Sequence, residues 1–270
     1  MSGQLTWDWL GAAEPRVRVD SSWPTTGSLT SSWREATGEG ARVCILDSGV
    51  AQDNTRPGPL AGSFMITTGS RGEPVVTPDD VGDTYGHGTA CASIIRRVAP
   101  ECSVTSMKVL GAGYGAGSTL LAGLAWAIEQ RFDVINLSLS TRHERFAARM
   151  RELVDEAYFR GIVVVAAAHN SRVESYPWRL SSVVSVGSHQ VEDENVLYYN
   201  SSPPVEFLAA GRNVRATGLD GADRYWSGNS FAAPLVAGRC ALIKSEHPDF
   251  TPVQVKCALI LSADNVFHGG

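Results

Sequence analysis

The 270-residue sequence contains no apolar run that approaches the roughly 18 residues needed to span a bilayer, so we expect no membrane partner. An excess of basic residues is also missing. The formal net charge is −5 at pH 7, which argues against nucleic acid as a partner. Residues 1–20 have neither a basic start nor a continuous apolar segment, and no secretory signal is therefore visible.

Cysteines are few, and their number is odd. The chain has five cysteines, with no spacing typical of a metal site: Cys44, Cys91, Cys102, Cys240 and Cys257. An odd number favours free thiols in a reducing compartment over a disulfide framework. With the missing signal and an initiator Met1, this predicts a cytoplasmic location, although removal of a signal or pro-segment would leave the same sequence.

Internal repeats, linkers and low-complexity tracts are absent as well. We therefore expect one domain, residues 1–270, in which residues 1–27 form a mostly loop extension and no pro-segment is visible. Residues 52–82 are poorly patterned, and we expect them to be mostly loop. We also expect the protein to be a monomer.

Short apolar runs predict buried strands. They are rich in β-branched residues without strict alternation, which is typical of parallel strands covered on both faces. The runs are residues 42–49, 104–111, 133–140, 161–168 and 182–188. Helical patterns lie at residues 87–97, 118–131, 144–160 and 251–266. The last pattern begins with Thr251 as N-cap and Pro252 at the first helical position. The alternation predicts an α/β fold, a three-layer, mostly parallel, doubly wound sheet with helices on both faces.

Asp47, His87 and Ser230 stand at the ends of these predicted elements. Asp47 ends a strand before a Ser-Gly turn, His87 begins a helix between glycines, and Ser230 begins another helix. Taken singly, each has an ordinary structural explanation as a turn or cap residue. Together they are the carboxylate, imidazole and hydroxyl of a catalytic triad, in one of its three recorded chain orders.

Longer motifs around these residues resemble a known family. "VCILDSGV", "HGTACASII" and "GNSFAAPLVAG" are similar to the aspartate, histidine and serine motifs of the subtilisin-like serine proteases, or subtilases. "MKVLG", "DVINLSLS" and "VVVAAAHNS" also resemble segments of that family. The resemblance extends from about Ser28 to Val266, and it implies the subtilisin-like form of the α/β fold.

The resemblance implies a serine endopeptidase that cleaves an extended peptide or protein substrate. Ser230 would attack the peptide carbonyl, His87 would take and return the proton, and Asp47 would orient the imidazole. Asn170 falls at the position of the family's oxyanion-binding amide. Two alternatives remain open: a transpeptidase, macrocyclase or leader-peptide processing enzyme that uses the same acyl-enzyme, and an inactive peptide-binding module.

The resemblance also implies a substrate cleft. Two segments match the family's edges, which hold an extended peptide between them by main-chain hydrogen bonds. These segments contribute Gly113, Tyr114 and Gly115 on one side and Ser138, Leu139 and Ser140 on the other. Without the family, the glycine-rich segment would suggest a phosphate loop, but it has neither the P-loop Lys-Ser/Thr nor dinucleotide spacing.

Three more positions, Ala168, His169 and Asn229, complete the predicted substrate-binding set. His169 and Ser140 replace glycines of the family, which affects substrate preference more than activity. Asn229 replaces a threonine that is thought to assist the oxyanion, and the asparagine amide would donate in its place.

We expect no metal and no other cofactor. The chain runs directly from the helix at 87–97 to the strand at 104–111, so it has no room for the loop that wraps a tightly bound calcium in many subtilases. The oxygen ligands of that site are therefore missing. Cys91 falls one helical turn after His87, so its thiol should lie beneath the predicted catalytic ring.

Overall fold

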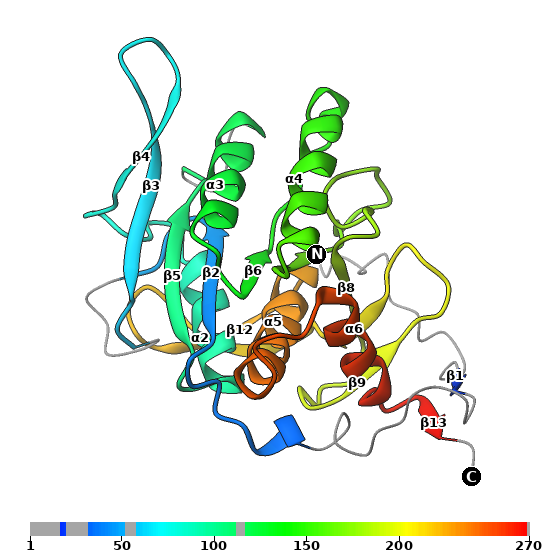
Figure 1. Cartoon of the computed structure of the whole chain (residues 1–270). Coiled ribbons are helices and arrows are strands. Elements are labelled where there is room, and N and C mark those ends of the chain that lie inside the picture. Colours follow the sequence, from blue (N-terminus) through cyan, green and yellow to red (C-terminus); the bar gives the residue numbers. More distant parts are fainter. Residues whose placement is uncertain (1–16, 20–31, 52–57, 112–116, 269–270) are drawn as a thin grey trace.

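A nine-stranded sheet organises the part of the chain that the structure describes (Figure 1). The structure is a computed structural model, and it describes residues 17–19, 32–51, 58–111 and 117–268. The strand order is β4-β3-β5-β2-β6-β7-β8-β10-β9. These strands are β2 (Arg42–Asp47), β3 (Gly62–Thr68), β4 (Pro74–Pro78), β5 (Ser103–Lys108), β6 (Val134–Leu137), β7 (Val163–Ala167), β8 (Val184–His189), β9 (Leu197–Tyr199) and β10 (Phe207–Ala210).

The strands from β3 across to β10 run parallel, and only the edge strands β4 and β9 are antiparallel to their neighbours within this described sheet. From β2 the chain adds β3 and β5 on one side, and then β6, β7 and β8 on the other. The strand order therefore reverses between β2 and β6, which is where ligand sites form in doubly wound sheets. The predicted mostly parallel, doubly wound sheet is confirmed.

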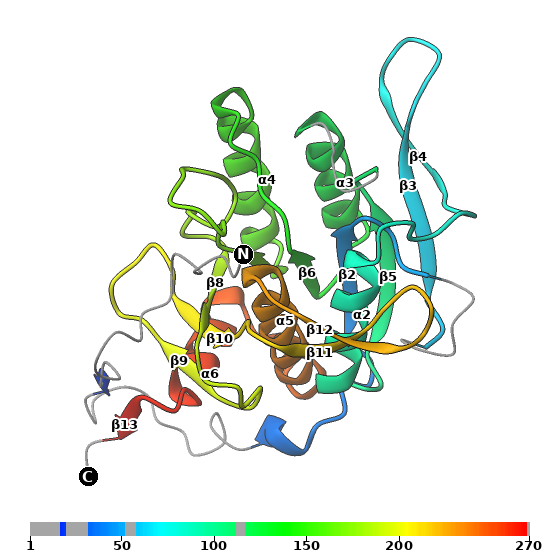
Figure 2. The ribbon, with the colours of Figure 1, turned by 180° about the vertical axis from the view of Figure 1, so that it is seen from behind.

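Helices cover both faces of the sheet and produce three layers (Figures 1 and 2). The helices are α2 (His87–Val98), α3 (Gly117–Glu129), α4 (Ala147–Phe159), α5 (Asn229–Glu246) and α6 (Pro252–Leu261), with short 3-10 turns η1 (Ser32–Glu35) and η2 (Glu144–Phe146). α2, α5 and α6 share one apolar core, and α3 and α4 share the other. The predicted helices on both faces are therefore confirmed.

Strand β2 shows how one strand serves both cores. Val43 and Ile45 belong to the core under α2 and α5, while Cys44 and Leu46 belong to the core under α3 and α4. Successive side chains of a strand point to opposite faces, so a strand covered on both sides must be apolar throughout. This explains why the central strands could be recognised as continuous apolar runs.

The start of α6 agrees with the sequence, whereas its end does not. Thr251 Oγ1 accepts from Gln254 N at 3.4 Å, Gln254 Oε1 accepts from Thr251 N at 2.9 Å, and Pro252 occupies the first position. The helix ends at Leu261 instead of 266, and the chain turns into β13 (Val266–His268). β13 pairs in parallel with β1 (Val17–Val19), inside the extension that we expected to be loop.

The expectation of mostly loop for residues 52–82 missed one hairpin. β3 and β4 form an antiparallel hairpin, which extends beyond the body of the sheet in Figure 1. At its tip, Gly69 N donates to Glu73 O at 2.7 Å, and Arg71 N donates to Glu73 Oε2 at 2.9 Å. Proline at both ends of β4 obscured the strand pattern. A second hairpin, β11 (Val214–Thr217) with β12 (Asp223–Trp226), was also not predicted.

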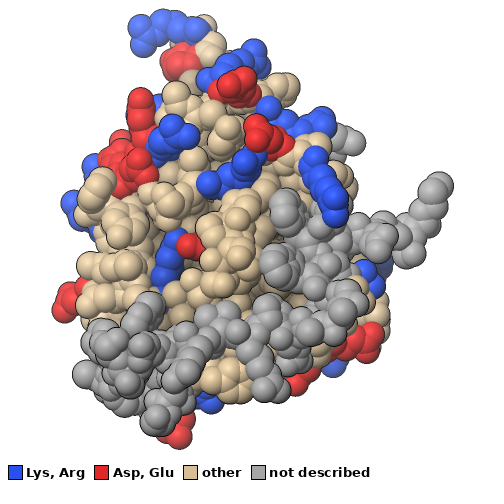
Figure 3. All heavy atoms as spheres, turned by 90° about the vertical axis from the view of Figure 1, so that its right-hand side faces the viewer, with Lys and Arg blue, Asp and Glu red and all other residues tan. Residues whose placement is uncertain are grey.

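The surface carries charges of both signs. On the face shown in Figure 3, acidic and basic side chains are intermixed and gather toward the upper part of the view. Within the described ranges, no helix has both the length and the apolar character needed to cross a membrane.

Lys244, in the last turn of α5, connects this helix to the loop before α6. It is 5% exposed, and its Nζ donates to Pro248 O at 2.5 Å and to Phe250 O at 3.0 Å. We predict that Lys244→Met lowers the free energy of unfolding by roughly 1–3 kcal/mol, because two carbonyl groups lose their donor while the apolar stem is kept. Urea unfolding measures this loss.

The matched control for Lys244→Met is Arg149→Met, at an exposed position of α4. A surface substitution of this kind changes stability by less than about 0.5 kcal/mol. Equal losses in the two variants would contradict the role assigned to Lys244.

Candidate active site

Asp47 and His87 meet where β2 ends and α2 begins. His87 Nδ1 lies 2.8 Å from Asp47 Oδ1. The aspartate is 1% exposed, and Ser48 N donates to the same carboxylate oxygen at 2.7 Å. Because a carboxylate only accepts, the imidazole proton is held at Nδ1 and Nε2 is left as the acceptor.

The imidazole of His87 is electrostatically coupled to this carboxylate. Burial by itself lowers the pKa of His87, but the charge of Asp47 and the hydrogen bond to it outweigh burial and hold the pKa above its usual range. The ring also packs against Phe231, with the two ring centroids 5.2 Å apart. Asp47 therefore makes His87 a stronger base.

Asp83, which our sequence reasoning missed, holds the strand end and the helix start together. Its carboxylate is buried and accepts hydrogen bonds of 2.7–3.0 Å from Ser48 Oγ, Tyr85 N, Gly86 N, Thr89 N and Thr89 Oγ1. A negative charge is favoured here because it lies at the N-terminal end of α2. An acidic residue about one turn before a predicted helix is the signal that could have identified it.

Gly88 allows the start of α2 to lie close to the end of β2. A Cβ atom at Gly88 would lie 2.1 Å from the carbonyl oxygen of Gly49, so no side chain fits there. The freed space lets Gly88 N donate to Ser48 Oγ at 3.1 Å. The glycine after His87 is therefore required by the approach of α2 to the end of β2.

Ser230 lies in the first turn of α5, and Pro234 follows it by one helical turn. Proline has no N–H, so the carbonyl of Ser230 receives no hydrogen bond from that position of the helix. Two side chains approach this carbonyl oxygen instead: Ser138 Oγ donates at 2.8 Å, and Cys91 Sγ lies 3.6 Å away. The proline thereby leaves this carbonyl available to Ser138, which follows β6, and to Cys91, which lies on α2.

Cys91 contacts both parts of the site. Its sulfur lies 3.9 Å from His87 Nδ1 and 3.6 Å from Ser230 O, which places it next to the imidazole as expected. Burial raises the pKa of Cys91 and keeps it a neutral thiol. It is therefore a packing residue of the site.

The hydroxyl of Ser230 points to a main-chain acceptor. Ser230 Oγ donates to Ser138 O at 3.1 Å, and among the described residues no hydrogen bond joins it to the His87 ring. Of the two hydrogen bonds expected in the triad, the one between Asp47 and His87 is therefore present, and the one between His87 and the hydroxyl of Ser230 is not.

Asn170 follows β7 and contacts the start of α5. Its Oδ1 accepts from Asn229 N at 2.9 Å, which fixes which end of the amide carries the donor. Nδ2 lies beside Gly228, where an added Cβ would be 3.3 Å from it. Asn170 is exposed, so a substrate can reach this amide.

Asn229 is fully buried, so of this predicted substrate-binding residue only the main chain could meet a substrate. Its Nδ2 donates to Ala168 O at 3.1 Å and to His169 O at 3.4 Å, and its Oδ1 accepts from Ser188 Oγ at 2.8 Å. Both amide hydrogens are used within the fold. The amide therefore does not assist an oxyanion as we had expected.

The other predicted substrate residues lie at the ends of β6 and β7. Leu139, Ser140 and His169 are half-buried, whereas the side chains of Ser138 and Ala168 are buried. His169 Nδ1 accepts from Ser171 N at 2.9 Å. The predicted residues of the opposite edge, Gly113, Tyr114 and Gly115, lie outside the described residues.

Asp47, His87 and Cys91 also form the only group of three possible metal ligands in the described ranges, with ligand atoms within 4.8 Å of one another. In this structure Asp47 and His87 Nδ1 are bonded to each other, and Cys91 is a buried thiol.

Comparisons with known proteins agree with this arrangement. The subtilase family model matches residues 38–270. Subtilisin DY from Bacillus licheniformis is 32% identical over 245 residues, which cover 85% of each chain. Subtilisin BL from Lederbergia lenta is 32% identical over 257 residues, which cover 88% of this chain and 90% of that protein.

Solved structures of similar proteins share the fold. A cold adapted subtilisin-like serine proteinase superimposes with a TM-score of 0.67 and 27% identity, covering 83% of this chain and 82% of that chain. A structure described as S41 psychrophilic protease gives a TM-score of 0.71 and 26% identity, covering 83% of each chain. The family match, these relatives and the shared fold lead to one conclusion: the chain belongs to the subtilases, the family of subtilisin-like serine proteases.

Proposed function

We propose that this serine protease is an endopeptidase that hydrolyses peptide bonds through an acyl-enzyme on Ser230, with Asp47, His87 and Asn170 as the other catalytic residues. The observation that supports this most is the 2.8 Å contact between the buried Asp47 carboxylate and His87 Nδ1. A carboxylate in that place keeps Nε2 available to accept a proton from a hydroxyl.

Acylation begins with rotation of Ser230 Oγ from Ser138 O toward His87 Nε2. Hydrogen bonds of this kind are often long or misaligned until a substrate is bound, and a hydroxyl rotates readily. His87 takes the hydroxyl proton as Oγ attacks the carbonyl carbon. The imidazolium, stabilised by Asp47, then gives that proton to the leaving amine as the C–N bond breaks.

Two donors serve the carbonyl oxygen as it becomes negative. The N–H of Ser230 lies in the first turn of α5, where no intrahelical acceptor exists. Asn170 Nδ2 is the second donor, since Oδ1 is held by Asn229 N. One donor of this type contributes roughly 10²–10³ in turnover. The N-terminal end of α5 adds a favourable dipole.

Deacylation repeats these steps with water in place of the serine. His87 removes a proton from water, the hydroxide attacks the acyl carbon, and the proton returns to Ser230 Oγ. An amine in the place of water would release a transpeptidation product from the same intermediate. Product analysis separates the two outcomes.

Residues at the ends of β6 and β7 select the substrate. We assign Leu139, Ser140 and His169 to the border of the cleft, because their side chains are partly exposed beside Asn170. Ser138 and Ala168 offer only their main chain, since their side chains are buried. An extended peptide bound there would be held mainly through main-chain hydrogen bonds.

This chemistry needs no metal or organic cofactor, because a hydroxyl, an imidazole, a carboxylate and two N–H donors supply every step. Between α2 and β5 the chain spans only residues 99–102, and Cys102 N donates to Ala99 O at 3.2 Å. A turn of this size does not supply the six or more oxygen ligands that calcium takes.

A serine-directed probe tests the nucleophile. We predict that a fluorophosphonate labels the wild-type protein at Ser230 and that Ser230→Ala abolishes labelling and lowers turnover by on the order of 10⁶. Ser245→Ala, a matched change at the far end of α5, should label normally. An unlabelled wild type would favour an inactive peptide-binding module. Mass spectrometry of the products should detect linear fragments and no cyclised peptide.

The Asp47–His87 contact predicts a pH dependence. The neutral imidazole is the base, so kcat/KM should fall as the pH drops through the pKa of His87, which Asp47 holds above about 6.5. Asp47→Asn removes the charge that raises this pKa. In this variant the fall of kcat/KM at acid pH should therefore move to lower pH, while turnover drops by about 10⁴. Asp220→Asn, at an exposed position, should leave the profile in place. If kcat/KM of Asp47→Asn fell at the same pH as in the wild type, the electrostatic coupling between Asp47 and His87 would be refuted.

The position of Cys91 predicts inhibition by mercurials. Mercury on its sulfur, 3.9 Å from His87 Nδ1, should displace the imidazole and inactivate the enzyme. Cys91→Val should remain active and become insensitive. Cys257→Val, which changes the partly exposed cysteine of α6, should keep the sensitivity of the wild type. If Cys91→Val were still inactivated, the inhibition would arise elsewhere and this role of Cys91 would be wrong.

A further inference from the structure

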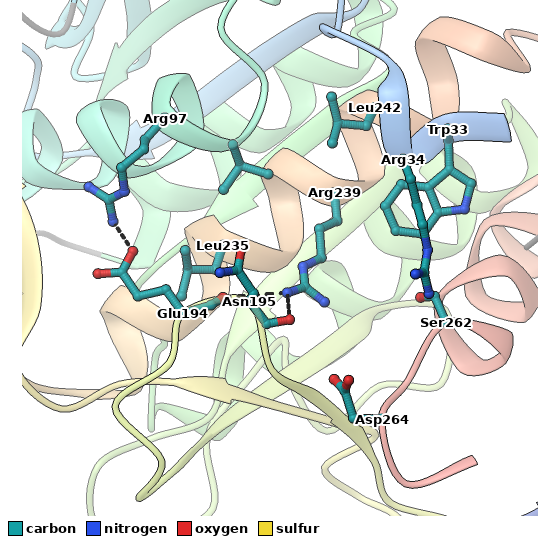
Figure 4. A pocket seen from close by; sticks show the side chains of 11 residues that line it. Trp33, Arg34, Arg97, Glu194, Asn195, Leu235, Arg239, Leu242, Ser262 and Asp264 are labelled. Atoms are coloured by element: carbon teal, nitrogen blue, oxygen red, sulfur yellow. Dashed lines mark hydrogen bonds and ion pairs between the residues drawn. The ribbon is translucent and has the colours of Figure 1, made fainter. Parts of the chain in front are cut away.

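A cavity lies along α5, away from the proposed catalytic residues (Figure 4). Its volume is about 650 Å³. Leu235, Arg239 and Leu242 line it, and their spacing places them on one face of the helix. Arg239 is about two and a half turns beyond Ser230, so the cavity is separate from the catalytic hydroxyl.

The cavity wall carries more positive than negative charge. Arg34, Arg97 and Arg239 line it together with two acids, Glu194 and Asp264. Arg97 forms an ion pair with Glu194. Figure 4 shows Arg239 and Asp264 pointing toward one another, with Arg34 nearby. Among the described residues of the wall, one positive charge is therefore left over.

Arg239 and Arg34 have no ionic partner at contact distance. Arg239 Nη2 donates to main-chain oxygens, at 2.5 Å to Asn195 and 3.4 Å to Glu194. Among the described residues, no carboxylate lies within 4.0 Å of either guanidinium. Burial lowers the pKa of Arg239, the charge of Asp264 opposes this, and the nearby charge of Arg34 lowers the pKa further. The two cations are thus close enough to repel each other.

Trp33 lines the same cavity and is 5% exposed. Its Nε1–H is itself buried, with no acceptor in the described part of the chain, so the surface that the indole gives to the cavity comes from its carbon atoms. The ring therefore adds apolar area to the wall next to Arg34 (Figure 4).

We propose that this cavity binds an organic carboxylate with an apolar body. A carboxylate neutralises the leftover charge and can accept two parallel hydrogen bonds from a guanidinium. Leu235 and Leu242 give the apolar wall, and the volume falls within the range of small-molecule sites. Two sources share this chemistry, the carboxyl terminus of a short peptide and a free aliphatic acid.

Calorimetric titration of the full-length protein with two pairs of probes tests the proposal. Octanoate is compared with octanamide, and acetyl-Leu-Leu with its carboxyl-terminal amide. Each acid should bind saturably at one site, and each neutral partner should bind roughly tenfold or more weakly, because charge-assisted hydrogen bonds are lost. The tighter acid identifies the source. No saturable binding of either acid, or equal binding of acid and amide, would overturn the proposal.

Substitutions locate the binding. Arg34→Gln should weaken binding of the acid by roughly tenfold, because one of the two cations of the wall is lost. Arg149→Gln removes one exposed arginine from α4 and should change nothing. Equal weakening in Arg149→Gln and Arg34→Gln would show attraction to net charge alone and refute the site. These measurements read binding, so their outcome is independent of proteolysis.

Discussion

The contact between Asp47 and His87 is the constraint around which the catalytic end of the molecule is arranged. A buried carboxylate is stable only when its charge is bonded, and Asp47 is bonded by His87 and by Ser48 N. Asp83 is a second buried carboxylate, and Ser48 Oγ links it to the same turn. Separating β2 from α2 would remove His87 from Asp47 and Ser48 Oγ from Asp83. The proposed base is therefore held by the same contacts that join β2 to α2.

Ser230, the proposed nucleophile, is held differently. α5 is buried along most of its length, so the main chain of Ser230 is fixed, and Pro234 leaves its carbonyl for Ser138 and Cys91. Only the hydroxyl has freedom, and it donates to Ser138 O. In the proposed reaction the hydroxyl must leave its acceptor, Ser138 O, give its proton to His87 and form an ester. A fixed imidazole next to a hydroxyl that can rotate suits these steps. The arrangement costs little reorganisation at the moment of attack.

The sequence predicted the features that depend on local pattern. Continuous apolar runs identified β2, β6 and β7, because strands covered on both faces have no polar side, and the motifs identified Asp47, His87 and Ser230. It missed features that arise from long-range pairing. β1 and β13 are short and pair with each other, and the prolines of β4 hide its edge position. Asp83 was missed because a turn aspartate is common, and its five donors become visible only in the folded chain.

Asn229 shows how a motif position can change its role while the site is kept. Its side chain turns inward and binds Ala168 O, His169 O and Ser188 Oγ, while its N–H orients Asn170. A buried amide with every hydrogen bonded is stable and rigid. It joins the segment after β7 to the start of α5, which are the two segments that carry the proposed oxyanion donors. In the proposed mechanism residue 229 therefore acts on the oxyanion through the position of Asn170, and the charge itself is left to Asn170 and the N–H of Ser230.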